Sequence, residues 1–141
     1  AAEKDRDYYY FLAGNCYYNI SFYGNAWNMS RRFMSLNQIK TGLPDDDNYF
    51  GCKTAMQYYT LAYKYAKTPK FKALCLRMMS ECNSKMIGYE YDSNWQFNYR
   101  YNLKPETNKY DIQLKKEYGT YYNDLTGSNC TAFIDYFKAR R

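Results

Sequence analysis

The chain has 141 residues and a net charge of +6, and 20 of its residues are tyrosine. It contains no valine, a leading β-strand residue, and no histidine, the commonest general base and metal ligand. An aromatic content of 21% argues against disorder, and no apolar run is long enough to span a membrane. Because valine is missing, helices are favoured over strands, and because histidine is missing, catalysis is disfavoured. The composition therefore predicts one all-α, non-enzymatic domain over residues 1–141.

Apolar residues at spacings of three and four predict a first helix over residues 5–22. Its buried face is predicted to consist of Tyr9, Leu12, Ala13, Cys16 and Ile20. Gly24 and Asn25 interrupt this pattern, and a shorter helix is predicted over residues 26–36. Residues 36–47 are expected to form a loop that ends in three aspartates. These aspartates lack the spacing of a calcium-binding loop, so they are expected to cap the next helix instead.

The most regular helical pattern covers residues 48–67. Its apolar face consists of Cys52, Ala55, Tyr59, Ala62 and Ala66. Thr68 and Pro69 are typical of a helix start, and a second helix is predicted from there to Ile87, with Gly88 as its end. The apolar face of this second helix consists of Phe71, Leu74, Cys75, Met78 and Cys82. Because the connection is so short, the two helices are predicted to pack as an antiparallel hairpin.

Aromatic residues alternate along residues 89–103, which favours either a short strand or an irregular extended segment lying on the helices. A further helix is predicted over residues 107–118, where Tyr110, Leu114 and Tyr118 are four apart and Gly119 ends the pattern. Residues 121–125 are expected to form a short turn. A last helix is predicted over residues 129–139.

Five cysteines occur at positions 16, 52, 75, 82 and 130, without a Cys-x-x-Cys pair. In a chain that lacks histidine this spacing argues against a zinc site, and no cofactor is predicted. Four of the five lie within apolar helical patterns, so they are expected to be small buried residues. One disulfide bond stays open as an alternative.

Residues 55–66, followed by residues 71–82, resemble one tetratricopeptide repeat, with small residues at the helix crossing. The usual glycine of the first helix and the proline that ends the repeat are absent. The chain also resembles the C-terminal part of larger helical-repeat proteins of Bacteroidetes, through residues 8–19, 23–27, 118–122 and 129–130. The resemblance implies a short array of antiparallel helical hairpins and a scaffold role. It also implies a periplasmic or outer-membrane-associated location, with the cytoplasm left open.

These features predict a protein–protein interaction module, because tyrosine adds contact area and a hydrogen bond at a modest entropic cost. The surface that meets a partner or ligand is predicted to consist of Trp27, Tyr91, Trp95, Tyr99, Arg100 and Tyr101. Stacking of the same aromatic rings on sugars makes glycan binding the alternative. Nucleic-acid binding is a weaker alternative, because the basic residues are scattered rather than clustered.

Overall fold

The computed structural model describes residues 3–21, 23–24, 26, 44–91 and 108–127, without the side chains of residues 88–91 and 126–127. Within these ranges the chain is all-α, as predicted, and contains no strand. The elements are a 3-10 turn η1 (Glu3–Asp5) and the helices α1 (Arg6–Asn19), α2 (Asp46–Tyr49), α3 (Lys53–Tyr65), α4 (Pro69–Tyr91), α6 (Lys109–Glu117) and α7 (Gly119–Gly127). The helices predicted over residues 26–36 and 129–139 lie outside the described residues, apart from Ala26.

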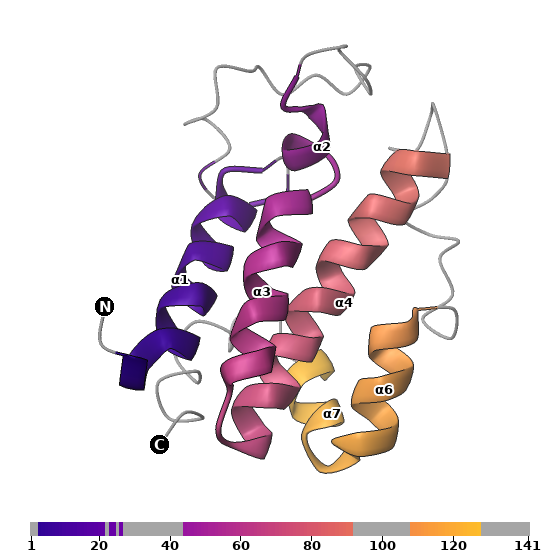
Figure 1. Cartoon of the computed structure of the whole chain (residues 1–141). Coiled ribbons are helices and arrows are strands. Elements are labelled where there is room, and N and C mark those ends of the chain that lie inside the picture. Colours follow the sequence, from indigo (N-terminus) through magenta and orange to yellow (C-terminus); the bar gives the residue numbers. More distant parts are fainter. Residues whose placement is uncertain (1–2, 22, 25, 27–43, 92–107, 128–141) are drawn as a thin grey trace.

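Three helices lie side by side, with α3 between α1 and α4 (Figure 1). The chain runs through α3 in the direction opposite to that of α1 and α4. Only residues 66–68 join α3 to α4, whereas residues 20–52, which include α2, join α1 to α3. The helix α6 packs against α4, and α7 turns back to contact both α4 and α6.

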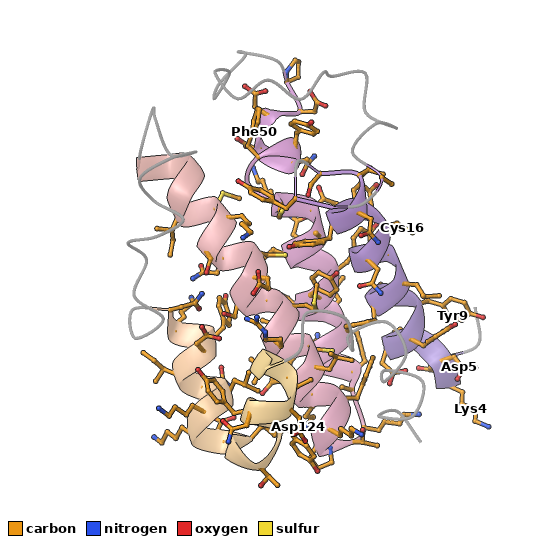
Figure 2. All side chains as sticks on the ribbon, turned by 180° about the vertical axis from the view of Figure 1, so that it is seen from behind. Lys4, Asp5, Tyr9, Cys16, Phe50 and Asp124 are labelled. Carbon is orange, nitrogen blue, oxygen red and sulfur yellow. The ribbon has the colours of Figure 1, made fainter. Side chains whose placement is uncertain are left out.

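The helix α1 buries a different face from the predicted one. Its buried residues are Asp7, Phe11 and Gly14, at spacings of four and three. The prediction was wrong for Tyr9, Cys16 and Ile20, which are exposed, and only partly right for Leu12 and Ala13, which are half-buried. Figure 2 shows Tyr9 and Cys16 on the outer side of α1.

The close approach of α1 and α3 at Gly14 explains this orientation. A Cβ atom at Gly14 would lie 2.7 Å from Cε1 of Tyr59, so the glycine leaves the space that the Tyr59 ring occupies. The Tyr59 hydroxyl donates a hydrogen bond to Asn15 Oδ1 at 2.7 Å, and its ring lies 5.4 Å from that of Phe11. Tyr59 therefore determines which face of α1 turns inward.

The predicted apolar face of α3 is confirmed, because Cys52, Ala55, Tyr59, Ala62 and Ala66 are all buried. The prediction of one continuous helix over residues 48–67 is wrong, since the chain forms α2 and then begins again at Lys53. Cys52 has a φ of 53°, a left-handed conformation that interrupts a right-handed helix.

Asn48 caps the new start of α3. Its Oδ1 accepts hydrogen bonds from the Thr54 backbone N–H at 3.0 Å and from Thr54 Oγ1 at 2.6 Å. Asp46 and Asp47 lie in the first turn of α2, where the helix dipole favours negative charge. The expected capping by aspartates is therefore only partly right, because Asp45 forms no side-chain cap on α2.

Thr68 and Pro69 begin α4 as predicted. Thr68 Oγ1 accepts a hydrogen bond from the Phe71 backbone N–H at 3.2 Å, and Pro69 is the first residue of the helix. The predicted end at Gly88 is wrong, because α4 continues to Tyr91. Residues 89–91 are thus helical, and the remainder of the predicted strand or irregular segment, residues 92–103, lies outside the described residues.

The buried face of α4 is wider than the predicted stripe, because α4 packs against α3 and also against α6 and α7. Met78 is only half-buried, and Met79 is buried instead. The buried residues of α4 are Phe71, Ala73, Leu74, Cys75, Leu76, Met79, Ser80 and Cys82. The prediction is therefore confirmed for Phe71, Leu74, Cys75 and Cys82.

A buried asparagine attaches α6 to α4. Asn108 is 3% exposed, and its Nδ2 donates hydrogen bonds to Ser80 O at 2.9 Å and to Ser84 Oγ at 3.0 Å. Its Oδ1 accepts from the Tyr110 backbone N–H at 3.1 Å, which caps α6. The helix predicted over residues 107–118 is confirmed as α6, which ends at Glu117, just before Gly119. The short turn expected over residues 121–125 is wrong, because these residues belong to the helix α7, which begins at Gly119.

The thiols of Cys52, Cys75 and Cys82 are free and buried, as predicted. Cys16 is also a free thiol, but it is exposed, so the expectation of burial was wrong for it. Cys130 lies outside the described residues.

Candidate functional site

The surface predicted from the sequence falls almost entirely outside the described residues. This applies to Trp27, Trp95, Tyr99, Arg100 and Tyr101, and to the side chain of Tyr91, the last residue of α4. That surface therefore stays a prediction, and the described helices provide a second candidate.

Four tyrosines from α1 and α3 form a continuous row, which we call the tyrosine ladder: Tyr65, Tyr10, Tyr58 and Tyr17. The rings of Tyr65 and Tyr10 are stacked with centroids 5.8 Å apart. The Tyr10 and Tyr58 rings are 6.3 Å apart and tilted by 34°, and the Tyr58 and Tyr17 rings are stacked 5.5 Å apart. Successive rings in the ladder thus come from alternate helices.

The helical repeat explains why these four rings meet. Tyr10 and Tyr17 are seven residues apart in α1, and Tyr58 and Tyr65 are seven residues apart in α3. A spacing of seven places both members of a pair on one side of their helix, two turns apart. Because α1 and α3 are antiparallel and approach closely at Gly14, the two pairs interleave.

Two cationic side chains lie against Tyr65 at one end of the tyrosine ladder. The Arg6 guanidinium lies 4.8 Å from the Tyr65 ring centroid, and Lys64 Nζ lies 5.4 Å from it. A hydrogen bond with Tyr65 raises the pKa of Arg6 further above the physiological range, in which an arginine side chain is always charged. Arg6 also forms an ion pair with Glu3 at 3.3 Å, so this end of the row is polar and of mixed charge.

The tyrosine ladder is accessible at its other end. Tyr17 is 39% exposed, and Tyr10, Tyr58 and Tyr65 are half-buried. The rings of Tyr65, Tyr10 and Tyr58 each have two neighbours in the row, which leaves ring edges and hydroxyls rather than open faces for another molecule. Such a surface supplies apolar area together with hydrogen-bond donors and acceptors.

Neither a metal centre nor a membrane span emerges from the part of the chain that the structure describes. In that part no three histidine, cysteine, aspartate or glutamate side chains gather closely enough to hold a metal ion. Across the same ranges no helix combines the length and the apolar character that crossing a bilayer requires. Comparisons with known proteins find no matching family model, no similar curated protein and no similar solved structure.

The sequence analysis did not identify the tyrosine ladder. The signal that was available is the shared spacing of seven between Tyr10 and Tyr17 and between Tyr58 and Tyr65. It becomes informative only once α1 and α3 are known to be neighbours, and they are separated by residues 20–52.

Proposed function

We propose that this chain is a non-enzymatic protein–protein interaction module that acts as a scaffold in a cell-envelope assembly. The observation that carries the proposal is the tyrosine ladder, a partly exposed aromatic row that ends beside Arg6. Tyrosine and arginine are, with tryptophan, the residues enriched at the positions that contribute most to protein–protein binding. The envelope location rests on the resemblance to Bacteroidetes helical-repeat proteins.

The stacking of the ladder supports this role energetically. Side chains that are mobile in the free protein lose rotamer freedom when a partner binds, which costs about 0.5–1.5 kcal/mol for each side chain. The rings of Tyr10 and Tyr58 are already held between their neighbours, so ordering them costs less. A pre-ordered row of this kind suits a rigid contact with a folded protein.

The tetratricopeptide-like arrangement belongs to the same proposal, with α3 and α4 as one repeat. Its support is the three-residue connection between Tyr65 and Pro69 and the buried alanines Ala55 and Ala62, which permit a close approach. In such arrays the helices of neighbouring repeats form the surface that binds a partner. The ladder, formed by α1 and α3, would lie on a surface of that kind.

Glycan binding is less well supported by the ladder. Sugars stack on open aromatic faces, whereas the faces of Tyr10 and Tyr58 are occupied by other rings. The predicted sugar-stacking tryptophans, Trp27 and Trp95, lie outside the described residues. Their fluorescence during a titration with polysaccharides tests this alternative, and a saturable shift with one sugar would favour it over the scaffold.

Site-specific photo-cross-linking tests the proposal. The photoreactive residue p-benzoylphenylalanine replaces Tyr17, and in a matched protein it replaces Tyr9, which lies on the same helix. Tyr9 is 48% exposed but contacts Tyr8 rather than the ladder. In cells that make the protein, we expect one discrete protein adduct from position 17 and none, or a different set, from position 9. The same adducts from both positions, or none from either, would contradict the proposal.

A binding measurement follows once the adduct identifies the partner. We expect Tyr17→Ser to weaken the binding of that purified partner about tenfold or more, since hot-spot residues contribute more than about 1.4 kcal/mol. Tyr9→Ser should leave the affinity within about twofold of the original. Equal effects of the two changes would show that the ladder is not the contact surface.

A further inference from the structure

The outward face of α1 is apolar, although α1 lies at the edge of the described helices (Figure 1). Within the described residues four large apolar side chains are exposed, and three of them, Tyr9, Tyr17 and Ile20, belong to α1 and its C-cap. Residues 8–20 include no charged side chain. The outward face of a surface helix normally carries charged residues, so this face has the composition of one that another molecule covers.

Tyr9, Ala13, Cys16 and Ile20 form this face, and we call them the outer stripe. Tyr9 is 48% and Ile20 37% exposed, Cys16 is exposed, and Ala13 is half-buried. The Ile20 backbone N–H donates to Cys16 O at 3.1 Å, so helical geometry continues to the end of the stripe. Because successive residues turn by about 100°, the outer stripe is centred about 160° around the helix from the buried face. It therefore faces away from α3, and Figure 2 shows Tyr9 and Cys16 on that side.

The spacing within the outer stripe reads the same in both directions. The intervals are four, three and four residues, with large side chains at the ends and small ones in the middle. When two such stripes pack antiparallel about a two-fold axis, Tyr9 of one copy meets Ile20 of the other. In the same arrangement Ala13 of one copy meets Cys16 of the other, and these small residues permit an interaxial distance of about 8 Å. The outer stripe is therefore complementary to a second copy of itself.

The charge of the chain also favours this face for a contact between two copies. Each copy has a net charge of +6, so contacts through charged surfaces would bring like charges together. Along residues 8–20 no charged side chain is present to cause this repulsion. In an antiparallel pair, moreover, the positive end of each helix dipole lies beside the negative end of the other.

We propose that the chain forms a two-fold symmetric homodimer in which the outer stripes of two copies pack antiparallel. This inference does not depend on the proposed binding partner, because the tyrosine ladder lies between α1 and α3, whereas the outer stripe faces away from α3. One helix from each copy makes a small interface, below the about 1,200 Å² at which stable complexes begin, so we expect a Kd of about 100 µM.

The first test is sedimentation velocity of the purified chain from about 5 µM to about 500 µM, a range that includes the expected Kd. We expect the mass to rise from that of a monomer towards that of a dimer. Ala13→Glu places a carboxylate at the centre of the outer stripe and should weaken dimerisation about tenfold or more, because an unpaired charge is costly to bury. Gln57→Glu adds the same charge at an exposed position of α3 and should leave the Kd unchanged. A monomer at every concentration, or equal weakening by the two variants, would overturn the proposal.

Cys16 provides a measurement on the original chain, which needs no variant to fold. Among the cysteines of the described residues it alone is exposed, and in the antiparallel pair the two copies of it lie about 4.5 Å apart along the helix axis. A short bismaleimide should therefore join two chains, and trypsin should release residues 7–31 joined to a second copy of the same peptide. If residues 7–31 were instead joined to residues 117–138, which contain Cys130, the chain's own C-terminal segment would lie on the outer stripe and the proposal would be wrong.

A mixture of two variants tests the antiparallel register. Both chains carry Cys16→Ser and Cys130→Ser, and one receives Tyr9→Cys and the other Ile20→Cys. In the proposed dimer positions 9 and 20 of different copies are opposite each other, whereas identical positions are about 17 Å apart along the axis. Mild oxidation should therefore form a disulfide between chains in the mixture, but not in either variant alone, because disulfides form only at short range. Disulfide-linked dimers of one variant alone would contradict the antiparallel packing.

Discussion

Replacing Gly14 with alanine tests the close packing of the Tyr59 ring of α3 on α1. The new Cβ would lie 2.7 Å from Cε1 of Tyr59, and ordinary contacts begin at 3.4 Å, so the ring must retreat by about 0.7 Å. The ring has little freedom to do so, because Phe11 lies against it and Asn15 holds its hydroxyl. Gly14→Ala is therefore an overpacking change rather than a simple gain in helix propensity.

The expected magnitude follows from three contributions. Overpacking costs about 1–3 kcal/mol, and strain on the hydrogen bond between Tyr59 and Asn15 costs about 0.5–1.5 kcal/mol. The better helix propensity of alanine offsets about 1 kcal/mol of this loss. We expect Gly14→Ala to lower the free energy of unfolding by about 2 kcal/mol, and the melting temperature by about 8 °C.

The matched control is Gly119→Ala, because a Cβ atom at Gly119 meets nothing within 4 Å. This change should raise the free energy of unfolding by up to about 1 kcal/mol. Both variants are measured by urea denaturation, followed by circular dichroism at 222 nm. If Gly14→Ala stabilised the protein as Gly119→Ala does, the close packing of Tyr59 on Gly14 would be refuted.

Asn108→Ala removes the cap of α6 and both hydrogen bonds to α4, so we expect a loss of about 2–3 kcal/mol in urea denaturation. Ser84→Ala, which removes one of these bonds, should cost about 1 kcal/mol, and equal losses would contradict the role of Asn108. Burial, followed by a hydrogen bond with Tyr118, raises the pKa of Tyr63 to about 12, so the fold favours the neutral phenol. The stabilisation that the fold gains from keeping the Tyr63 phenol neutral is complete below the ordinary tyrosine pKa of 10.0, and it is lost as the pH rises through 12. Helical ellipticity and phenolate absorbance should therefore change together in that window. The variant Tyr63→Phe should make the loss of ellipticity with rising pH less steep. Ellipticity that stays constant through pH 12 would contradict this reasoning.

The sequence predicts α3 and α4 well because their buried faces repeat regularly. The alanines of α3 and the apolar residues of α4 recur at spacings of three and four, and Thr68 with Pro69 marks the helix start. Local signals of this kind need no knowledge of distant segments. The break before α3 could not be predicted in this way. The break depends on the left-handed backbone of Cys52, which the spacing of apolar residues does not reveal.

The buried face of α1 and the tyrosine ladder could not be predicted in the same way. In α1 an aspartate and a glycine are buried beside Phe11, whereas Tyr9 and Tyr17 are exposed, which departs from the usual pattern of polarity. Tyrosine has an apolar ring and a polar hydroxyl, so its position along a helix does not distinguish core from surface. Only the contact of Gly14 with Tyr59, between segments far apart in the sequence, determines the orientation.

The separation of α1 from α3 in the sequence also bears on the order in which the helices come together. Closing the three-residue connection between α3 and α4 costs less chain entropy than closing residues 20–52, by about 2 kcal/mol. The pair α3–α4 is therefore expected to form early, and α1 to dock late and detach first. Since α1 supplies Tyr10 and Tyr17, half of the ladder exists only while α1 is docked. The binding epitope is consequently discontinuous, and a synthetic peptide copied from α1 or α3 alone would not reproduce it.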